Sequence, residues 1–452
     1  MPAEEPPAQN ASNRNINFAE ARLVAALQQI DLIAESEFTF SDGPKALALI
    51  RKKLHKHLTD VASLRTDGVS DPKIIRAECH RALQGVDTVL PILGLIVRST
   101  DIRNAFEIYG PIRDLAKLLV AGEKDSKPCL IWSSGLDYVP MTFRTIKYLP
   151  GFIIITIPSS EAANPLLVPL AGHELGHRLW TDQKLENWSS RPILEGVVRF
   201  VQANYKEAPQ LSNLPKKARR SIESLTNYLT ENSYRFSAWN SMLLNARRQT
   251  EEFFCDLIGY FLFGESFVHA FAYLLSPRPP HERWGEYPAM RARAALLIQA
   301  KEKFATKVSD AYTIPDDLVE LFAEEEQQDF WARAADEAAI AAATALIDVV
   351  VGFSQREAWK KLPGLSTSRR EEIKNSWFAW GVPPENAGSL GNILNAAWDA
   401  TLDEKFWESF PPFRLQPEEK RAAFRVEALR EIVLKSIEVF EYELIQKTRQ
   451  IK

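Results

Sequence analysis

Hydrophobic side chains recur every three or four residues over most of the chain, which is the spacing of helices that bury one face. The region 17–125 shows this spacing, for example at Leu27 and Ile30. The alanine-rich stretch 334–351 and the stretch 423–449 predict two further long helices. Glycine, which disfavours helices, occurs only 19 times in 452 residues. The pattern therefore predicts a mainly helical protein.

A short part of the chain departs from this helical period. Residues 129–132 form an apolar run, and residues 138–146 alternate weakly between apolar and polar positions. Residues 152–157, Phe-Ile-Ile-Ile-Thr-Ile, are β-branched and are flanked by Pro-Gly and by Pro. These are strand signals. They predict a mainly α fold with a small β-sheet, an α+β class.

Changes in composition divide the chain into four expected parts. Residues 1–16 are polar and rich in Pro, Ala, Asn and Glu, which predicts a disordered tail. A helical region, 17–125, and the strand-containing part, 126–300, follow. A further helical region, 301–452, comes after the prolines at 277, 279 and 280.

The charge balance and the cysteines exclude several classes of protein. The 55 basic and 59 acidic residues give a formal charge of −4, whereas a nucleic-acid-binding protein needs a basic face. Three cysteines without a CxxC pair exclude a disulfide framework and a cysteine-rich zinc module, and they suit a reducing compartment. The N-terminus has no secretory pattern, and the longest apolar runs are far below the ~20 residues of a membrane span. We therefore expect a cytoplasmic protein without a membrane span.

The motif that carries chemistry is His173-Glu174-Leu175-Gly176-His177, an H-E-x-x-H sequence. Residues i and i+4 of a helix share one face, so both imidazoles can bind one zinc ion. Glu174 is placed to act as the general base toward water at that zinc. The alternative is an ordinary helix that carries two histidines by chance.

A later segment supplies a third ligand. A catalytic zinc site has three protein ligands and one open position. The metzincin extension is absent, because Trp180 and Gln183 occupy its glycine and histidine positions. The other main arrangement of such zinc sites takes a glutamate from a later helix, with an aspartate four residues beyond it. Glu252 and Asp256 match this pattern, which implies that Glu252 would bind the metal and Asp256 would orient His173 through its second nitrogen.

Other interpretations of this later segment remain open. Glu251 is a rival ligand, but its i+4 residue is Cys255 and not an acid. Cys255 and Gly259 are small enough to let this helix approach the metal helix closely. The segment could also be an amphipathic helix with exposed acids, although Asp256 stands among apolar residues and a carboxylate there needs a partner.

Together, H-E-x-x-H and E-x-x-x-D resemble the gluzincins, the thermolysin-like class of zinc metallopeptidases, over about residues 170–295. Tyr287-Pro288 with Arg293 is similar to a His-Pro-x-x-x-x-Arg stretch of the CAAX-processing-type peptidases, with Tyr287 in place of the histidine. The resemblance implies a zincin-like core flanked by helical N- and C-terminal regions. It also implies an edge strand ahead of the metal helix, a role suited to residues 152–157, where an extended peptide would add as a further strand.

The expected function is zinc-dependent hydrolysis of a peptide or protein substrate, with one Zn²⁺ per chain. Glu174 would accept a proton from water and deliver it to the leaving amine. Tyr287 is the first candidate for the hydrogen-bond donor that stabilises the oxyanion. The alternatives are a zinc-binding regulatory or scaffold protein without peptidase activity, and a helical scaffold with a chance motif. The other candidate donors are Tyr260, His269 and His281.

Overall fold

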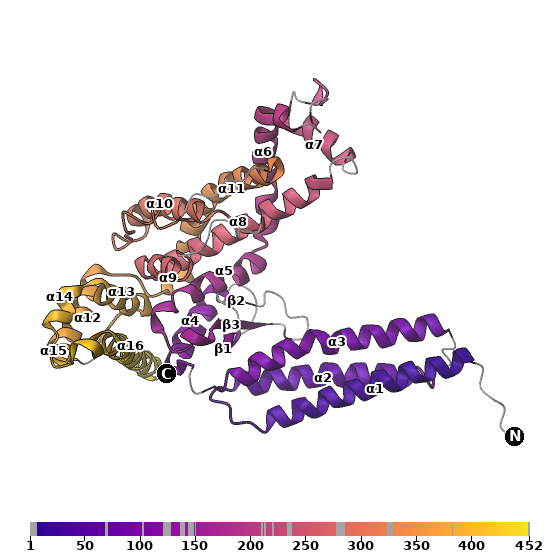
Figure 1. Ribbon diagram of the computed structural model, residues 1–452, viewed down its shortest axis with the longest axis horizontal. Coiled ribbons are helices and arrows are strands. Elements are labelled where there is room, and N and C mark those ends of the chain that lie inside the picture. The colour runs from indigo at the N-terminus through magenta and orange to yellow at the C-terminus, as the bar shows by residue number, and fades with distance from the viewer. Residues whose placement is uncertain are drawn as a thin grey trace. The chain divides into compact units, whose positions relative to one another are not determined.

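In the computed structural model the chain forms two compact units, which are described separately below (Figure 1). The first unit comprises 1–104 and 127–162, and the second comprises 105–126 and 163–452. The structure describes residues 7–67, 71–101, 104–120, 128–135, 141–142, 149, 151–208, 211, 214–218, 221–232, 237–276, 285–322, 329–381 and 383–450.

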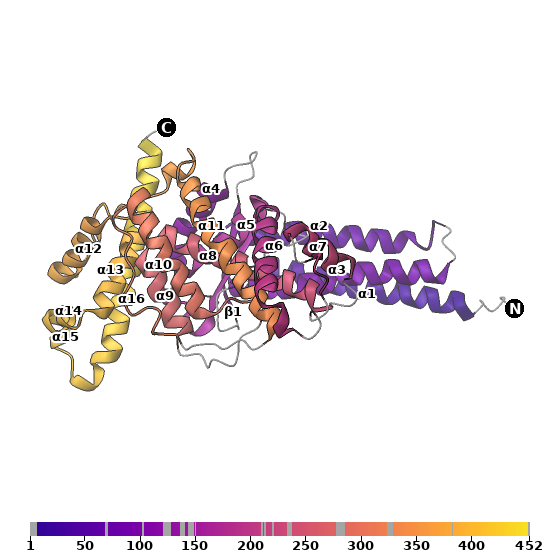
Figure 2. The same cartoon turned by 90° about the horizontal axis from the view of Figure 1, so that it is seen from above.

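Three long helices form most of the first unit and lie side by side in both views (Figures 1 and 2). Buried positions on α1 alternate between spacings of three and four, as in a coiled coil. The helix bounds are Pro7–Ala34 for α1, Asp42–Ser63 for α2 and Pro72–Arg98 for α3. The buried α1 positions with this spacing are Ile16, Ala19, Leu23, Ala26 and Ile30.

The start of α1 differs from the sequence-based expectation. Residues 7–16 are helical, although their composition predicts a disordered tail. Ile16 is buried and extends the apolar stripe toward the N-terminus, which gives this end of the helix a packing surface. Helix α3 begins at Pro72, directly after the capping residue Asp71, a position that proline suits because its missing N–H would have no partner within the helix.

The small sheet also belongs to the first unit. Strand β1 (Cys129–Gly135) pairs in parallel with β3 (Phe152–Pro158), with Cys129 opposite Phe152. The short β2 (Met141–Thr142) pairs antiparallel with β3 at Thr156 and Ile155. Buried Asp42 at the start of α2 accepts a hydrogen bond from the backbone N–H of Leu130 and so attaches β1 to the bundle. The prediction of two strands at 129–132 and 152–157 is confirmed.

The expected role of 152–157 as an edge strand is wrong. The strand order is β1-β3-β2, so β3 is the middle strand and has a partner on each side. All seven residues of β3 are buried, as their continuous apolar sequence requires. Strand propensity identified the strand, but it carries no information about which neighbours pair with it.

The described residues of the second unit form helices joined by turns and loops, without strands, and its centre is α8. Helices α5 and α11 both pack on α8, and α6 packs on α11. The longer helices of this unit are α4 (Tyr109–Val120), α5 (Leu170–Asp182), α6 (Leu185–Asn204), α7 (Ile222–Glu231), α8 (Ser237–Phe263), α9 (Glu265–Leu275), α10 (Met290–Lys307), α11 (Phe330–Ser354), α12 (Thr367–Trp380), α13 (Leu390–Leu402) and α16 (Glu418–Gln450). The short ones are α14 (Glu404–Ser409) and α15 (Pro411–Arg414).

The two long helices predicted near 334–351 and 423–449 are confirmed as α11 and α16. Within the described residues, α11 is also the one helix long and apolar enough to cross a membrane. Its alanines pack against α6 and α8, and a Cβ on Gly196 of α6 would lie 2.8 Å from the Cα of Ala338. Core helices of this kind have the same length and composition as a membrane span, so the feature is weak support for one.

The division into units differs from the expected domain ranges. Helix α4 belongs with the C-terminal helices, and the sheet belongs with the N-terminal bundle. The boundary expected near residue 300 falls inside α10, which continues unbroken from Met290 to Lys307. The proline-rich loop that suggested this boundary lies outside the described residues.

Candidate metal centre

The second unit holds the H-E-x-x-H motif on α5 at the point where this helix packs closest to α8. A Cβ on Gly172 would lie 2.9 Å from the Cα of Gly259, and one on Gly176 would lie 2.7 Å from the Cα of Cys255. Neither added carbon fits, so these glycines are required for the backbones to approach. Residue numbers rise along α5 as they fall along α8, so the two helices run antiparallel. The predicted close approach through Cys255 and Gly259 is confirmed.

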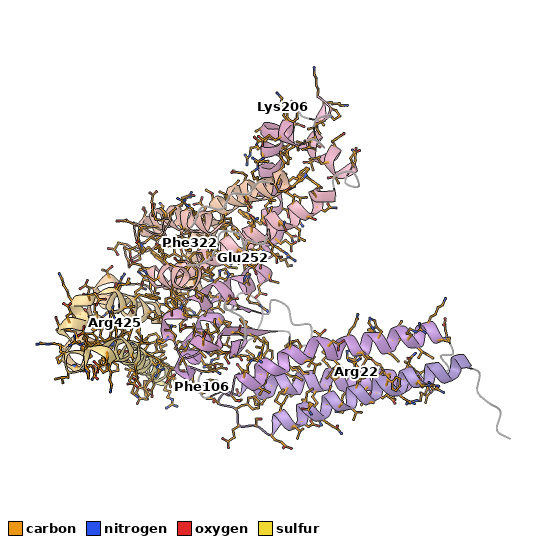
Figure 3. All side chains as sticks on the ribbon, viewed as in Figure 1. Arg22, Phe106, Lys206, Glu252, Phe322 and Arg425 are labelled. Atoms are coloured by element: carbon orange, nitrogen blue, oxygen red, sulfur yellow. The ribbon has the colours of Figure 1, made fainter. Side chains whose placement is uncertain are left out.

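The C-terminal half of α8 is buried on every side, from Gln249 to Phe263. Three acids, Glu251, Glu252 and Asp256, lie in this half. Their burial excludes the interpretation that these acids form an exposed face of the helix. Each buried carboxylate instead needs a partner that compensates its charge. Figure 3 marks Glu252 on α8 in the second unit.

His173 contacts two of these acids through its two ring nitrogens. Its Nε2 lies 3.3 Å from Oε2 of Glu252, and its Nδ1 lies 2.9 Å from Oδ1 of Asp256. Because a carboxylate only accepts, the proton between His173 and Asp256 belongs to Nδ1. The predicted pairing of Asp256 with His173 is thus present in the structure.

Asp256 is held in turn by Arg293 of α10. The guanidinium donates from Nε to Oδ2 and from a terminal nitrogen to Oδ1, each at 2.7 Å. The Asp256 side chain is fully buried, and the Arg293 guanidinium carbon lies 4.8 Å from the ring centre of Phe271. This bidentate pair compensates the buried charge and fixes the orientation of the carboxylate.

His177 repeats the arrangement one turn further along α5. Its Nε2 lies 3.6 Å from Oε1 of Glu252, and its Nδ1 lies 2.9 Å from Oε1 of Glu251. The ring centres of His173 and His177 are 5.0 Å apart, and the rings are nearly perpendicular. Both Nε2 atoms therefore face the carboxylate of Glu252, while both Nδ1 atoms are tied to another acid behind the ring.

The two distances from the imidazoles to Glu252 are compatible with ligands of one zinc ion. Ligand atoms about 2.0–2.2 Å from a tetrahedral zinc lie about 3.4 Å apart. The two Nε2–Glu252 separations, 3.3 and 3.6 Å, lie on either side of that value. Histidines that bind a metal through one nitrogen commonly donate the other N–H to a carboxylate or a carbonyl, as His173 and His177 do here.

The electrostatics of the cluster also favour a divalent cation. Glu251, Glu252 and Asp256 each contact an imidazole, and Arg293 offsets one of their three charges. Burial disfavours the charged imidazolium, but hydrogen bonds to Asp256 and Glu252 outweigh it and raise the pKa of His173 to about 10. The pKa of Glu252 is held far below its usual range despite its burial, by its hydrogen bond to His173 and by the nearby charges. The site therefore stabilises positive charge between the two histidines.

A second donor set shares both histidines and replaces Glu252 with Cys255, since the three ligand atoms lie within 4.8 Å of one another. The thiol sulfur lies 3.2 Å from Nδ1 of His177, which is the nitrogen that also faces Glu251. A metal held by Cys255 and by this Nδ1 would compete with that hydrogen bond. Glu252, by contrast, faces the Nε2 atoms of both histidines, whereas Cys255 lies beside Nδ1 of His177.

Comparison of the chain with protein-family models, with curated proteins and with solved structures finds no match in any of the three.

The remaining predicted residues differ in their placement. Glu174 is buried on α5 next to His173, and Tyr287 precedes α10 with 44% of its surface exposed. Tyr260 donates to the carbonyl of Thr313 at 3.3 Å and packs in an aromatic cluster, so its hydroxyl is already engaged. His269 stacks on Trp398, as expected of a core histidine. His281 lies outside the described residues.

Sequence reasoning missed the position of Glu251 behind His177. The signal was present, because Glu251 and Cys255 form a second i, i+4 pair one residue before Glu252 and Asp256. Adjacent residues on a helix point about 100° apart, so one acid can bind the metal while its neighbour reaches around the second histidine. The antiparallel register of α5 and α8 decides that Glu252 faces the Nε2 atoms and that Glu251 contacts Nδ1 of His177.

Proposed function

We propose that the chain is a zinc-dependent metallopeptidase of the thermolysin-like class. The observation that carries the proposal is the convergence of both Nε2 atoms on Glu252, at 3.3 and 3.6 Å, with each Nδ1 tied to a carboxylate. His173, His177 and Glu252 would hold the zinc. When bound, zinc supplies Lewis acidity toward water and toward a peptide carbonyl.

Glu174 is the proposed general base. It follows His173 directly on α5 and is buried, and a carboxylate beside such a site can take a proton from the attacking water. It then returns the proton to the amine that leaves. Asp256 and Arg293 would hold the Nδ1 side of His173, so that Nε2 is the nitrogen that would bind the metal in place of its proton.

Tyr287 is the proposed donor to the carbonyl oxygen as charge develops on it. Gln249 donates to the carbonyl of Gly285 at 2.8 Å, and Arg293 holds Asp256 at 2.7 Å. These anchors lie on either side of Glu252 on α8, about 10 Å apart along the helix. Tyr287 lies between these two anchored positions, Gly285 and Arg293, in the sequence. This arrangement supports a role for the phenol in stabilising the oxyanion.

Removal and return of zinc tests this function. We expect the purified protein to cleave members of a mixed peptide library, to lose that activity in a strong chelator and to regain it with zinc, because the proposed water activation needs the metal. Products are identified by mass spectrometry.

Cleavage that survives complete removal of metal would contradict the proposed mechanism. Stoichiometric zinc without cleavage of any peptide would favour the alternative of a zinc-binding regulatory or scaffold protein.

A further inference from the structure

The buried side chain of Glu251 lies behind His177, on the opposite side of the ring from Glu252. Its Oε1 is 2.9 Å from Nδ1, and the ring presents Nε2 to Glu252 at 3.6 Å. The side chains of Glu251 and His177 are both less than one-tenth exposed. In such a site, a hydrogen bond to one nitrogen determines where the other nitrogen points.

The register of the helices gives each histidine its own acid. Because α5 and α8 run antiparallel, Asp256 meets His173, and Glu251, five residues earlier, meets His177. The two acids approach Nδ1 at the same distance, 2.9 Å. The E-x-x-x-D pattern therefore describes only one half of the support for the metal ligands.

We propose that Glu251 is a positioning residue for the metal centre: its carboxylate holds His177 so that Nε2 faces the metal position. The inference rests on the proposed zinc site and extends it to the second histidine. The hydrogen bond keeps the proton on Nδ1 and restricts rotation of the ring, so less order must be gained when the metal binds. The charge of Glu251 adds to the field that favours a divalent cation.

Cys255 is the competing partner for the same nitrogen, at 3.2 Å. Sulfur is a weak acceptor, whereas a carboxylate forms a charge-assisted bond with an N–H donor. Cys255 lies where α8 approaches Gly176 of α5 so closely that a Cβ on Gly176 would clash with it. A small side chain is needed at this contact, and this need explains why a cysteine stands there. We therefore assign the orientation of His177 to Glu251, and Cys255→Ala should leave zinc affinity within about twofold of wild type.

Zinc affinity of the full chain tests the assignment. The dissociation constant is measured by competition with a chromophoric chelator for wild type, Glu251→Gln, Glu251→Ala and Cys255→Ala. Loss of a supporting partner weakens metal binding by about 10–100-fold in such sites. We expect about tenfold weaker binding for Glu251→Gln, which keeps an acceptor oxygen without the charge, and a larger loss for Glu251→Ala. Glu195→Gln on α6, which removes an ion pair with Arg191, is the matched control and should bind as wild type does.

Two further readouts separate positioning from folding and from failure of the site. The melting temperature of metal-free Glu251→Gln should equal that of wild type, and its cobalt-substituted form should show an altered visible spectrum. Wild-type affinity and an unchanged cobalt spectrum in Glu251→Gln would overturn the assignment of Glu251. Absence of zinc binding by wild type itself would instead overturn the proposed zinc site, and the assignment with it.

Discussion

Arg293→Met should lower the free energy of local opening around α8 by about 3–5 kcal/mol, the range found when one partner of a buried ion pair is removed. Arg293 is the donor of two hydrogen bonds to Asp256, whose side chain is fully buried. Methionine has a similar length, but it leaves that carboxylate without its compensating charge. Hydrogen exchange of the α8 amides in the metal-free protein measures the change locally, which suits a chain whose two units need not unfold together.

Arg51→Met is the matched control, because Arg51 also donates at 2.7 Å to an aspartate, Asp31. Both side chains of that pair are about half exposed, so its loss should cost less than about 1 kcal/mol at the α2 amides. Equal, small effects of the two substitutions would show that the Asp256 charge is not buried as described.

Glu174→Gln should retain zinc and lose peptide hydrolysis by about 10²–10⁴-fold, the usual contribution of a general base. Glutamine preserves the size and the acceptor oxygen of the side chain, but it cannot take a proton from water. The proposed zinc ligands His173, His177 and Glu252 are unchanged, so the metal content should stay at the wild-type level. Turnover of a peptide cleaved by wild type and elemental analysis of the same samples measure both quantities.

Glu186→Gln controls for the removal of an acid on a helix of the same unit, where Glu186 is largely exposed and pairs with Arg247. It should keep full activity. A Glu174→Gln protein that binds zinc and cleaves as fast as wild type would remove Glu174 from the mechanism.

The sequence identified the parts of this fold that depend on local pattern. The alanine-rich stretch 334–351 predicts α11, the stretch 423–449 predicts α16, and the β-branched run at 152–157 predicts β3. Pairing depends on contacts distant in sequence, so the same run could not reveal that β3 lies between β1 and β2. For the same reason, nothing in the pattern showed that α4 belongs with helices more than forty residues later.

The candidate site shows the same limit. The resemblance carried by H-E-x-x-H and E-x-x-x-D led to the expected contacts of His173 with Asp256 and of both histidines with Glu252, and these contacts are present. The place of Glu251 depends on the antiparallel register of two helices packed through Gly172 and Gly176, which no single-helix pattern contains.

The central claim is that His173, His177 and Glu252 bind one zinc ion, and elemental analysis tests it most directly. Wild type, His177→Ala, Glu252→Ala and Cys255→Ala are purified without chelator, and the zinc content of each folded protein is measured. The account predicts about one zinc per chain in wild type and in Cys255→Ala, and little or none in His177→Ala and Glu252→Ala. Zinc retained in Glu252→Ala but lost in Cys255→Ala would contradict this ligand set, and well-folded wild type without metal would contradict the site itself.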